Sequence, residues 1–428
     1  MGFERKRGKL SALNRLLRTG DASVFQATVG DLARLASVRY VITLDTDTRL
    51  PRDAGRELAG CMAHPLNRPR IDAKTRIVTG GHAVLQPRVT ATLSDAQRSA
   101  FSRLLAGDAG IGPLAEDRAT MLGTWAQRGT PADAKSIREG LSERAPELVL
   151  RTARGCDVDG EDRRGFAEAR ELAQASDLVL LCLGESTQMS GENASRSSIE
   201  LPGVQEELAL DVAAAGTPVV LLLSAGRPIA MERVEPKMNA ILAIWQPGTR
   251  GALAIAEALL GRRSPSGRLA VTFPRTTGQI PIYHNMRPRA RLGNQGAYQD
   301  IPTSPLYEFG HGLSYTSFDY GPIALSAPSV APGKTLLAEV TVTNSGRRPA
   351  AETVFWFVHH PSASITQPIK ELKHFEKAEI AAGASRTFRF TIETDRDLSF
   401  PDANGKPILD RGPIVLLAGP RRARFEVR

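Results

Sequence analysis

The chain has 428 residues, of which 42% are hydrophobic and 24% are charged, so several compact domains are expected and disorder throughout is excluded. Its net charge is +9, but the arginines are spread over every segment without a basic stripe, so no nucleic-acid partner is expected. The sequence contains no apolar run of about 20 residues, so no membrane partner is expected either.

The N-terminal sequence and the cysteines indicate the cellular compartment. The start, MGFERKRGK, is basic but has no apolar stretch behind it, which predicts no signal peptide and a cytoplasmic chain as encoded. The three cysteines, Cys61, Cys156 and Cys182, lie far apart and lack metal-ligand spacing. We therefore expect reduced, ordinary thiols.

Residues 1–110 contain few predicted elements. One clear strand, Tyr40–Leu44 (YVITL), precedes the sequence DTDTRLP. A second strand-like run covers Ile77–Val84, and a helical pattern covers Ala96–Leu105. Because a parallel sheet needs covering layers, these elements predict only part of an α/β domain.

Residues 111–320 alternate between strand and helix patterns. The strand-like runs are Glu147–Leu150, Leu178–Leu183, Val219–Leu223, Ala240–Trp245 and Leu269–Phe273. The helical patterns between them are Gly165–Ala173, Pro202–Ala215 and Gly251–Leu260. Short strands that are apolar on both faces, separated by amphipathic helices, predict a doubly wound, mostly parallel sheet of the α/β class.

Residues 321–428 change to a period of two. Ala338–Thr343 (AEVTVT) alternates, and Asn344-Ser345-Gly346 then predicts a turn. Further alternating runs are Thr353–Val358, Thr387–Ile392, Ile414–Leu417 and Arg424–Val427. Several short strands with such turns predict a small all-β, antiparallel sandwich.

The most informative polar segment is the loop between the runs Leu178–Leu183 and Val219–Leu223. Open α/β sheets bind ligands at the carboxyl ends of their strands, so the loop glutamate Glu192 is a candidate general acid, with a solvated loop carboxylate as the alternative. Glu185, directly after the strand, is the weaker candidate, and we interpret it as ordering the loop or capping a helix. Arg196 is expected either to pair with a carboxylate or to lie on the surface.

From about Gly112 onward the chain resembles the C-terminal half of family 3 glycoside hydrolases, bacterial β-glucosidases in particular. The α/β stretches that carry this resemblance are IGPLAEDRATMLGTW, GESTQMSGENASRSSIELP, SAGRPIAM, IWQPGTRGALAIAEALLGRRSPSGRLAVTFPRTTGQIPIYH and PLYEFGHGLSYTSFDY. PIKELKHFEK resembles the fibronectin type III-like module that closes those enzymes. The resemblance implies three parts: an N-terminal fragment (1–110), an α/β sandwich domain (111–320) and a fibronectin type III-like domain (321–428).

The resemblance also implies a function, retaining hydrolysis of terminal β-D-glucosidic bonds. Glu192 matches the family's acid/base, a role that needs a mobile carboxyl group. Trp125 matches a position near the entrance of the sugar site, with a core tryptophan as the alternative, and Arg196 is a candidate substrate-binding residue. No cofactor is expected, and the expected partner is a β-glucoside or oligosaccharide.

The nucleophile is where the sequence departs from the family. The family takes an aspartate from a TIM barrel, which needs ~250 residues, whereas only residues 1–110 precede the α/β domain. We therefore expect little or no turnover by this chain alone, and a separate barrel-bearing chain is a possible partner. The alternative hypothesis is a non-catalytic carbohydrate-binding or scaffold remnant of a gene fusion.

The segment before the α/β domain resembles a different family. The stretches FERKRGKLSALNRLL, YVITLDTDTRLPRDA, MAHPLNRP, VLQPRV and SAFSRLLAGDAGI resemble the glycosyltransferase region of cyclic β-1,2-glucan synthases. That resemblance makes Asp45 and Asp47 candidate ligands of Mg²⁺ or Mn²⁺, with an exposed turn as the alternative. The two resemblances meet near Gly110-Ile111-Gly112, so we interpret this point as a fusion junction.

Overall fold

The computed structural model describes residues 110–288, 298 and 300–428, and isolated positions before them (13, 15–17, 19–21, 23, 70–71, 78–80). The fold divides into two compact units, Met1–Thr92 and Leu93–Arg428. In the first unit, β1 (Arg70–Ile71) pairs antiparallel with β2 (Val78–Gly80), which falls within the predicted run Ile77–Val84. The predicted strand Tyr40–Leu44, the predicted helix Ala96–Leu105, and Asp45 and Asp47 lie outside the described residues.

The second unit begins with a five-stranded parallel sheet. Its strands, in spatial order, are β4 (Thr152–Ala153), β3 (Gly110–Ile111), β5 (Val179–Gly184), β6 (Val219–Ser224) and β7 (Ala240–Ala243). Every neighbouring pair is parallel. The chain adds β4 on one side of β3 and then crosses to add β5 on the other side. The strand order therefore reverses between β3 and β5, where a doubly wound sheet opens a crevice at its carboxyl edge.

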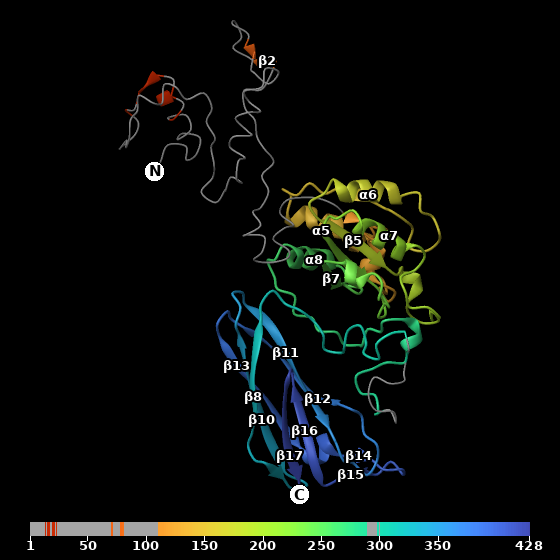
Figure 1. The fold of residues 1–428 in the computed structure, drawn as a ribbon, viewed down its shortest axis with the longest axis vertical. Helices are drawn as coiled ribbons and strands as arrows, with labels where there is room; N and C mark the ends of the chain where they lie inside the picture. The colour runs from red at the N-terminus through yellow and green to blue at the C-terminus, as the bar shows by residue number, and fades with distance from the viewer. Residues whose placement is uncertain are drawn as a thin grey trace. The chain divides into compact units, whose positions relative to one another are not determined.

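Helices cover both faces of this sheet (Figure 1). The helices α6 (Phe166–Gln174) and α7 (Gln205–Ala213) share one apolar cluster with Val179, Leu181 and Leu183. The helices α5 (Ile137–Arg144) and α8 (Gly251–Leu259) share the other with Leu180 and Cys182. Since neighbouring side chains of a strand point to opposite faces, a strand covered on both sides must be apolar throughout.

Shorter helical turns connect these elements. They are α4 (Ala119–Leu122) and the 3₁₀ turns η4 (Pro131–Asp133), η5 (Thr187–Met189), η6 (Glu235–Lys237) and η7 (Thr277–Gln279). Over the part of the chain that the structure describes, no helix has the length and apolar character that crossing a membrane requires.

Two predicted strands of the α/β domain are wrong. The run Glu147–Leu150 forms a turn in which the Leu148 amide donates to the Ala145 carbonyl, and Val149 is exposed; the edge strand β4 begins two residues later. The run Leu269–Phe273 forms scattered backbone hydrogen bonds with residues 307–311 and only an isolated bridge at Phe273. Both runs are apolar, but neither lies beside another strand of the sheet.

The C-terminal part is a sandwich of two sheets. One sheet has the order β13 (Ser385–Glu393), β10 (Thr335–Asn344), β8 (Phe318–Leu325). The other has the order β12 (Glu371–Ile380), β11 (Ala350–His359), β16 (Gly412–Ala418), β17 (Arg421–Val427), β9 (Ser329–Val330). A π-helical turn, η8 (Thr394–Leu398), and a hairpin of β14 (Phe400–Pro401) with β15 (Pro407–Ile408) complete it.

The sandwich core follows the period-two pattern of its strands. Burial along β10 alternates almost residue by residue, and Trp356, Phe388 and Phe425 are fully buried between the sheets. All strand pairs of the sandwich are antiparallel except β17 with β9. The predicted fold class, a doubly wound α/β domain followed by an all-β sandwich, is confirmed.

A buried polar contact joins the α/β domain to the sandwich. Glu352 of β11 is 5% exposed, and its carboxylate forms an ion pair with Arg268 of the segment after α8. The Tyr320 hydroxyl donates to the same carboxylate at 2.7 Å, and burial raises the pKa of Tyr320. The buried charge of Glu352 thus has two protein partners that replace water.

The two-sided burial of β5 generates a stability prediction. Leu181 is completely buried, so Leu181→Ala should leave a cavity and lower the free energy of unfolding by about 2–5 kcal/mol. Urea unfolding followed by circular dichroism measures the change. As a control, Leu313→Ala removes a leucine that is 78% exposed and should change stability by less than about 0.5 kcal/mol. If both variants lost the same free energy of unfolding, the assignment of Leu181 to the core between sheet and helices would be contradicted.

Candidate functional site

Two loops meet at the carboxyl edge of the sheet, where the strand order reverses. One follows β3 (residues 112–118) and continues through α4 to Trp125; the other follows β5 (residues 185–204). At Gly112 (φ 114°), an added Cβ would lie 2.4 Å from the Cys182 carbonyl oxygen, so the chain leaving β3 passes directly against β5. Only glycine fits this close approach.

Thr124 holds the first loop against the second. Its hydroxyl oxygen lies 2.8 Å from the Thr187 carbonyl oxygen, and 3.0 Å from both the carbonyl and the hydroxyl oxygen of Ser190. The Gln246 side-chain amide, which comes from the segment after β7, donates to the same Ser190 hydroxyl at 3.1 Å. Segments following three different strands are therefore tied together at Ser190.

Glu192 lies on a tight turn immediately after Ser190. The Ala194 amide donates to the Gly191 carbonyl at 3.3 Å, which places Glu192 and Asn193 at the two central positions. Gly191 (φ 105°) and Asn193 (φ 60°) have the positive φ angles that glycine and asparagine tolerate best. Glu192 is exposed, so its carboxyl group is free to contact a ligand.

Trp125 borders the turn at Gly191, the residue before Glu192. An added Cβ at Gly191 would lie 3.7 Å from Trp125 Cε2 and 2.5 Å from Thr124 Cγ2, so the indole borders the turn. Trp125 is 61% exposed, so the alternative of a core tryptophan is wrong. An exposed indole offers a flat apolar face of the kind that stacks on a sugar ring.

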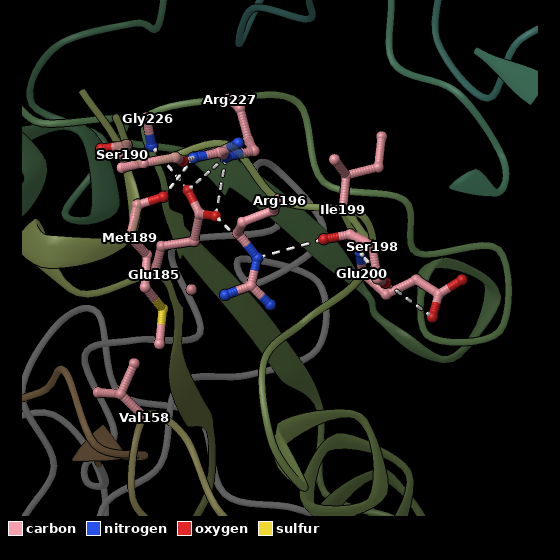
Figure 2. A network of polar contacts seen from close by, with 12 residues as sticks. Val158, Glu185, Met189, Ser190, Arg196, Ser198, Ile199, Glu200, Gly226 and Arg227 are labelled. Atoms are coloured by element: carbon pink, nitrogen blue, oxygen red, sulfur yellow. Dashed lines mark hydrogen bonds and ion pairs between the residues drawn. The ribbon is translucent and has the colours of Figure 1, made fainter. Parts of the chain in front are cut away.

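Glu185, at the start of the same loop, is buried and paired. Its side chain is 1% exposed, and the Arg227 Nε donates to its Oε2 at 3.2 Å and lies 2.9 Å from its Oε1 (Figure 2). The Gly226 amide also donates to Oε2, at 3.3 Å. This geometry agrees with the prediction that Glu185 orders the loop, and it leaves Glu185 without access to a ligand.

Arg227 is a residue that the sequence analysis missed. Gly184, the last residue of β5, pairs with Ser224, the last residue of β6. Glu185 and Arg227 therefore follow the ends of neighbouring parallel strands. The sequence could have predicted their ion pair, because it has an acidic residue after one strand and an arginine after the next. The guanidinium also reaches the loop, because its Nη2 donates to the Ala194 carbonyl at 2.8 Å and to the Met189 carbonyl.

Arg196 lies on the other side of the Glu185 carboxylate. Its Nε is 3.6 Å from Glu185 Oε1 and donates to the Ser198 carbonyl at 3.2 Å. The expected pairing of Arg196 with a carboxylate is thus present, and the carboxylate is Glu185. Figure 2 shows the Arg196 terminal nitrogens turned away from Glu185, so they are available to a ligand.

Gln205 fixes the end of β5, where the loop begins. Its side chain is fully buried; its Oε1 accepts from the Gly184 amide at 2.8 Å, and its Nε2 donates to the Gly184 carbonyl at 2.8 Å. The same Nε2 donates to the Val158 carbonyl at 2.7 Å. The backbone groups at the strand end are thus satisfied without water.

The chemistry of the site is that of an exposed carboxylate beside an indole. Burial raises the pKa of Cys182 to about 12 and that of Cys156 to about 11, so both are neutral thiols near pH 7 and poor nucleophiles. Among the described residues, no group of three or more His, Cys, Asp or Glu side chains could hold a metal ion.

Matches to known protein families identify the kinds of domain that the chain contains. Residues 105–315 match the glycosyl hydrolase family 3 C-terminal domain, and residues 352–421 match the fibronectin type III-like domain. The chain therefore carries the C-terminal domain of glycosyl hydrolase family 3, followed by a fibronectin type III-like domain.

Individual relatives and solved structures agree with this assignment. The chain is 33% identical to a beta-xylosidase of Formosa agariphila, over 72% of this chain and 43% of that protein. It is 32% identical to the periplasmic beta-glucosidase of Salmonella typhimurium, over 74% of this chain and 45% of that protein. The structure of a beta-glucosidase from Listeria innocua in complex with gluconolactone matches with a TM-score of 0.71 and 31% identity, over 75% of this chain and 45% of that chain. The chain thus spans less than half the length of these relatives.

The raised thiol pKa values generate a prediction about reactivity. A thiol with a raised pKa gains thiolate only as the pH approaches that pKa, so neither Cys156 nor Cys182 should react with a disulfide reagent between pH 7 and pH 9. Peptide mapping after labelling with 5,5′-dithiobis(2-nitrobenzoate) measures this in the native protein. The control uses the same reagent in about 8 M urea, which unfolds the protein and exposes its core. Under these conditions both thiols should be labelled. Rapid native labelling of either thiol would contradict the burial.

Proposed function

We propose that this chain supplies the acid/base half of a retaining β-glucosidase, with Glu192 as the general acid and base. The observation that carries the proposal is the position of an exposed carboxylate on a fixed turn, beside an exposed indole, at the reversal point of a doubly wound sheet. The match to the glycosyl hydrolase family 3 C-terminal domain supports the same reaction class, and two of the matched proteins are named beta-glucosidases.

In the proposed reaction, Glu192 donates its proton to the glycosidic oxygen as the bond to the anomeric carbon breaks. In the second step, the resulting carboxylate takes a proton from the water that attacks the same carbon. The nucleophile of the first step is an aspartate of a TIM barrel, which residues 1–110 are too few to form, so a separate barrel-bearing chain is its proposed source. Trp125 and Arg196 are the proposed sugar contacts: the indole stacks on a ring and the free guanidinium nitrogens donate to hydroxyl groups.

An assay on phenyl β-D-glucoside tests the acid/base role. Glu192→Gln keeps the size of the side chain but removes its ability to exchange a proton. It should therefore lower kcat/KM by roughly 10²–10⁴-fold, the usual contribution of a general acid/base.

The matched control is Glu200→Gln, which changes another exposed glutamate at the end of the same loop and should leave kcat/KM unchanged. If the wild-type protein hydrolyses the glucoside and Glu192→Gln is equally active, the assignment of Glu192 is wrong.

The second candidate function is carbohydrate binding without turnover. The exposure of Trp125 favours it, because a stacking platform binds sugar whether or not a nucleophile is present. A wild-type protein that binds cellobiose in a calorimeter, but hydrolyses no aryl glucoside, would establish this function in place of the first.

Both functions predict that Trp125 contributes to sugar binding. Trp125→Ala removes the stacking face and should weaken cellobiose binding roughly tenfold, since a stacked ring contributes about 0.5–1.5 kcal/mol. Isothermal titration calorimetry on the full chain measures the affinity. Tyr283→Ala, which removes an aromatic side chain that is 51% exposed outside the two loops, is the control and should bind as wild type does. Equal affinities for Trp125→Ala and wild type would contradict the proposed contact.

A further inference from the structure

Arg227 contacts three separate points of the loop that carries Glu192. Its Nε binds the Glu185 carboxylate at the start of the loop, and its Nη2 donates to the carbonyl groups of Met189 and Ala194. Met189 and Ala194 lie on either side of the turn that carries Glu192. One guanidinium group therefore links the residues on both sides of Glu192 to Glu185, which directly follows β5.

Burial makes this contact rigid. The Glu185 side chain is 1% exposed and that of Arg227 is 20% exposed. Glu185 Oε1 accepts no hydrogen bond from the described residues, so its charge is balanced by the nearby Arg227 Nε. Water has little access to replace the arginine, and a buried carboxylate without its partner is strongly disfavoured. The arginine is therefore held in one position, and it holds the two carbonyl groups with it.

The backbone around Arg227 also limits movement of the loop. An added Cβ at Gly226 would lie 2.3 Å from Ser190 Oγ, so the segment before Arg227 is in close contact with the residue that precedes the turn. The Ser190 hydroxyl also forms hydrogen bonds with Thr124 and Gln246. The Ala194 end of the turn has no comparable support besides the Arg227 Nη2 bond and the bond to Gly191.

We propose that Arg227, anchored by Glu185, is a positioning residue that fixes the 189–194 turn and thereby the position of Glu192 on that turn. This inference rests on the proposed acid/base role of Glu192. Arg196 does not share the function, because its Nε lies 3.6 Å from Glu185 and donates to Ser198, beyond the turn. The positioning role requires the forked guanidinium, which binds the carboxylate and the carbonyl groups through different nitrogens.

Hydrogen–deuterium exchange on the full chain tests the positioning role directly. Arg227→Lys retains the positive charge beside Glu185 but replaces the fork with one nitrogen. The double variant Glu185→Gln/Arg227→Met removes both charges, so no buried carboxylate is left unpaired and the fold is retained. In both variants, the Ala194 amide, whose hydrogen bond to the Gly191 carbonyl closes the turn, should exchange roughly tenfold faster, while β5 and β6 keep wild-type protection.

Arg233→Met is the matched control for this measurement. Arg233 lies further along the same segment and forms an ion pair with Glu206 at 2.6 Å, but its side chain is 73% exposed. Its loss should leave the exchange of the Ala194 amide unchanged. Wild-type exchange of this amide in both Arg227 variants would overturn the inference, and so would faster exchange spread evenly over the sheet.

The leaving-group dependence of hydrolysis separates this inference from the proposed function. Phenolate needs a proton to leave, whereas 2,4-dinitrophenolate leaves without one, so a misplaced acid slows the phenyl glucoside selectively. Arg227→Lys should reduce kcat/KM for the phenyl glucoside roughly tenfold and leave kcat/KM for the dinitrophenyl glucoside close to wild type, because kcat/KM reports only the steps up to cleavage of the glycosidic bond.

Two different failures are then distinguishable. If Glu192→Gln shows no selective loss with the phenyl glucoside, the acid/base role is wrong. If Glu192→Gln shows that loss and Arg227→Lys shows neither the loss nor the faster exchange, the positioning role alone is wrong. If the chain hydrolyses neither glucoside, the exchange measurement still decides whether Arg227 fixes the turn.

Discussion

The burial of β5 and β6 on both faces is the constraint on which the rest of the α/β domain depends. Every residue of these two strands is buried, and alternate side chains pack against opposite helix layers. A polar side chain within either strand would lose its water without gaining a partner. Polar groups are therefore found where the strands end, and the parallel arrangement collects these ends at one edge.

Glu185 and Glu192, both in the loop after β5, lie in very different surroundings. Glu185, next to the strand, is enclosed and paired with Arg227, so it serves the geometry of the loop. Glu192 is further out, on a turn whose backbone needs glycine and asparagine, and it remains exposed. The arginine paired with the buried carboxylate contacts the loop on both sides of the exposed carboxylate, at Met189 and Ala194.

The long, well-covered elements of the fold were predictable from local pattern. The runs Leu178–Leu183 and Val219–Leu223 became β5 and β6 with nearly the same bounds, because a strand buried on both faces must be continuously apolar. The two-residue strand β3 was missed, since it is too short to show any period. Leu269–Phe273 was wrongly predicted as a strand, because an apolar run also packs as irregular chain when no strand edge lies beside it.

For the site, the residue pattern alone indicated a loop with Glu192 after a buried strand, and the family resemblance added Trp125, which lies on the loop after β3. Only the tertiary structure decided that Trp125 is exposed beside the turn, and that Glu185 is buried against Arg227. The physical reason is that local sequence reports which residues prefer burial and where a strand ends. Contacts between residues far apart in the chain depend on the order of the strands, which places the loops after β3, β5 and β6 at one edge.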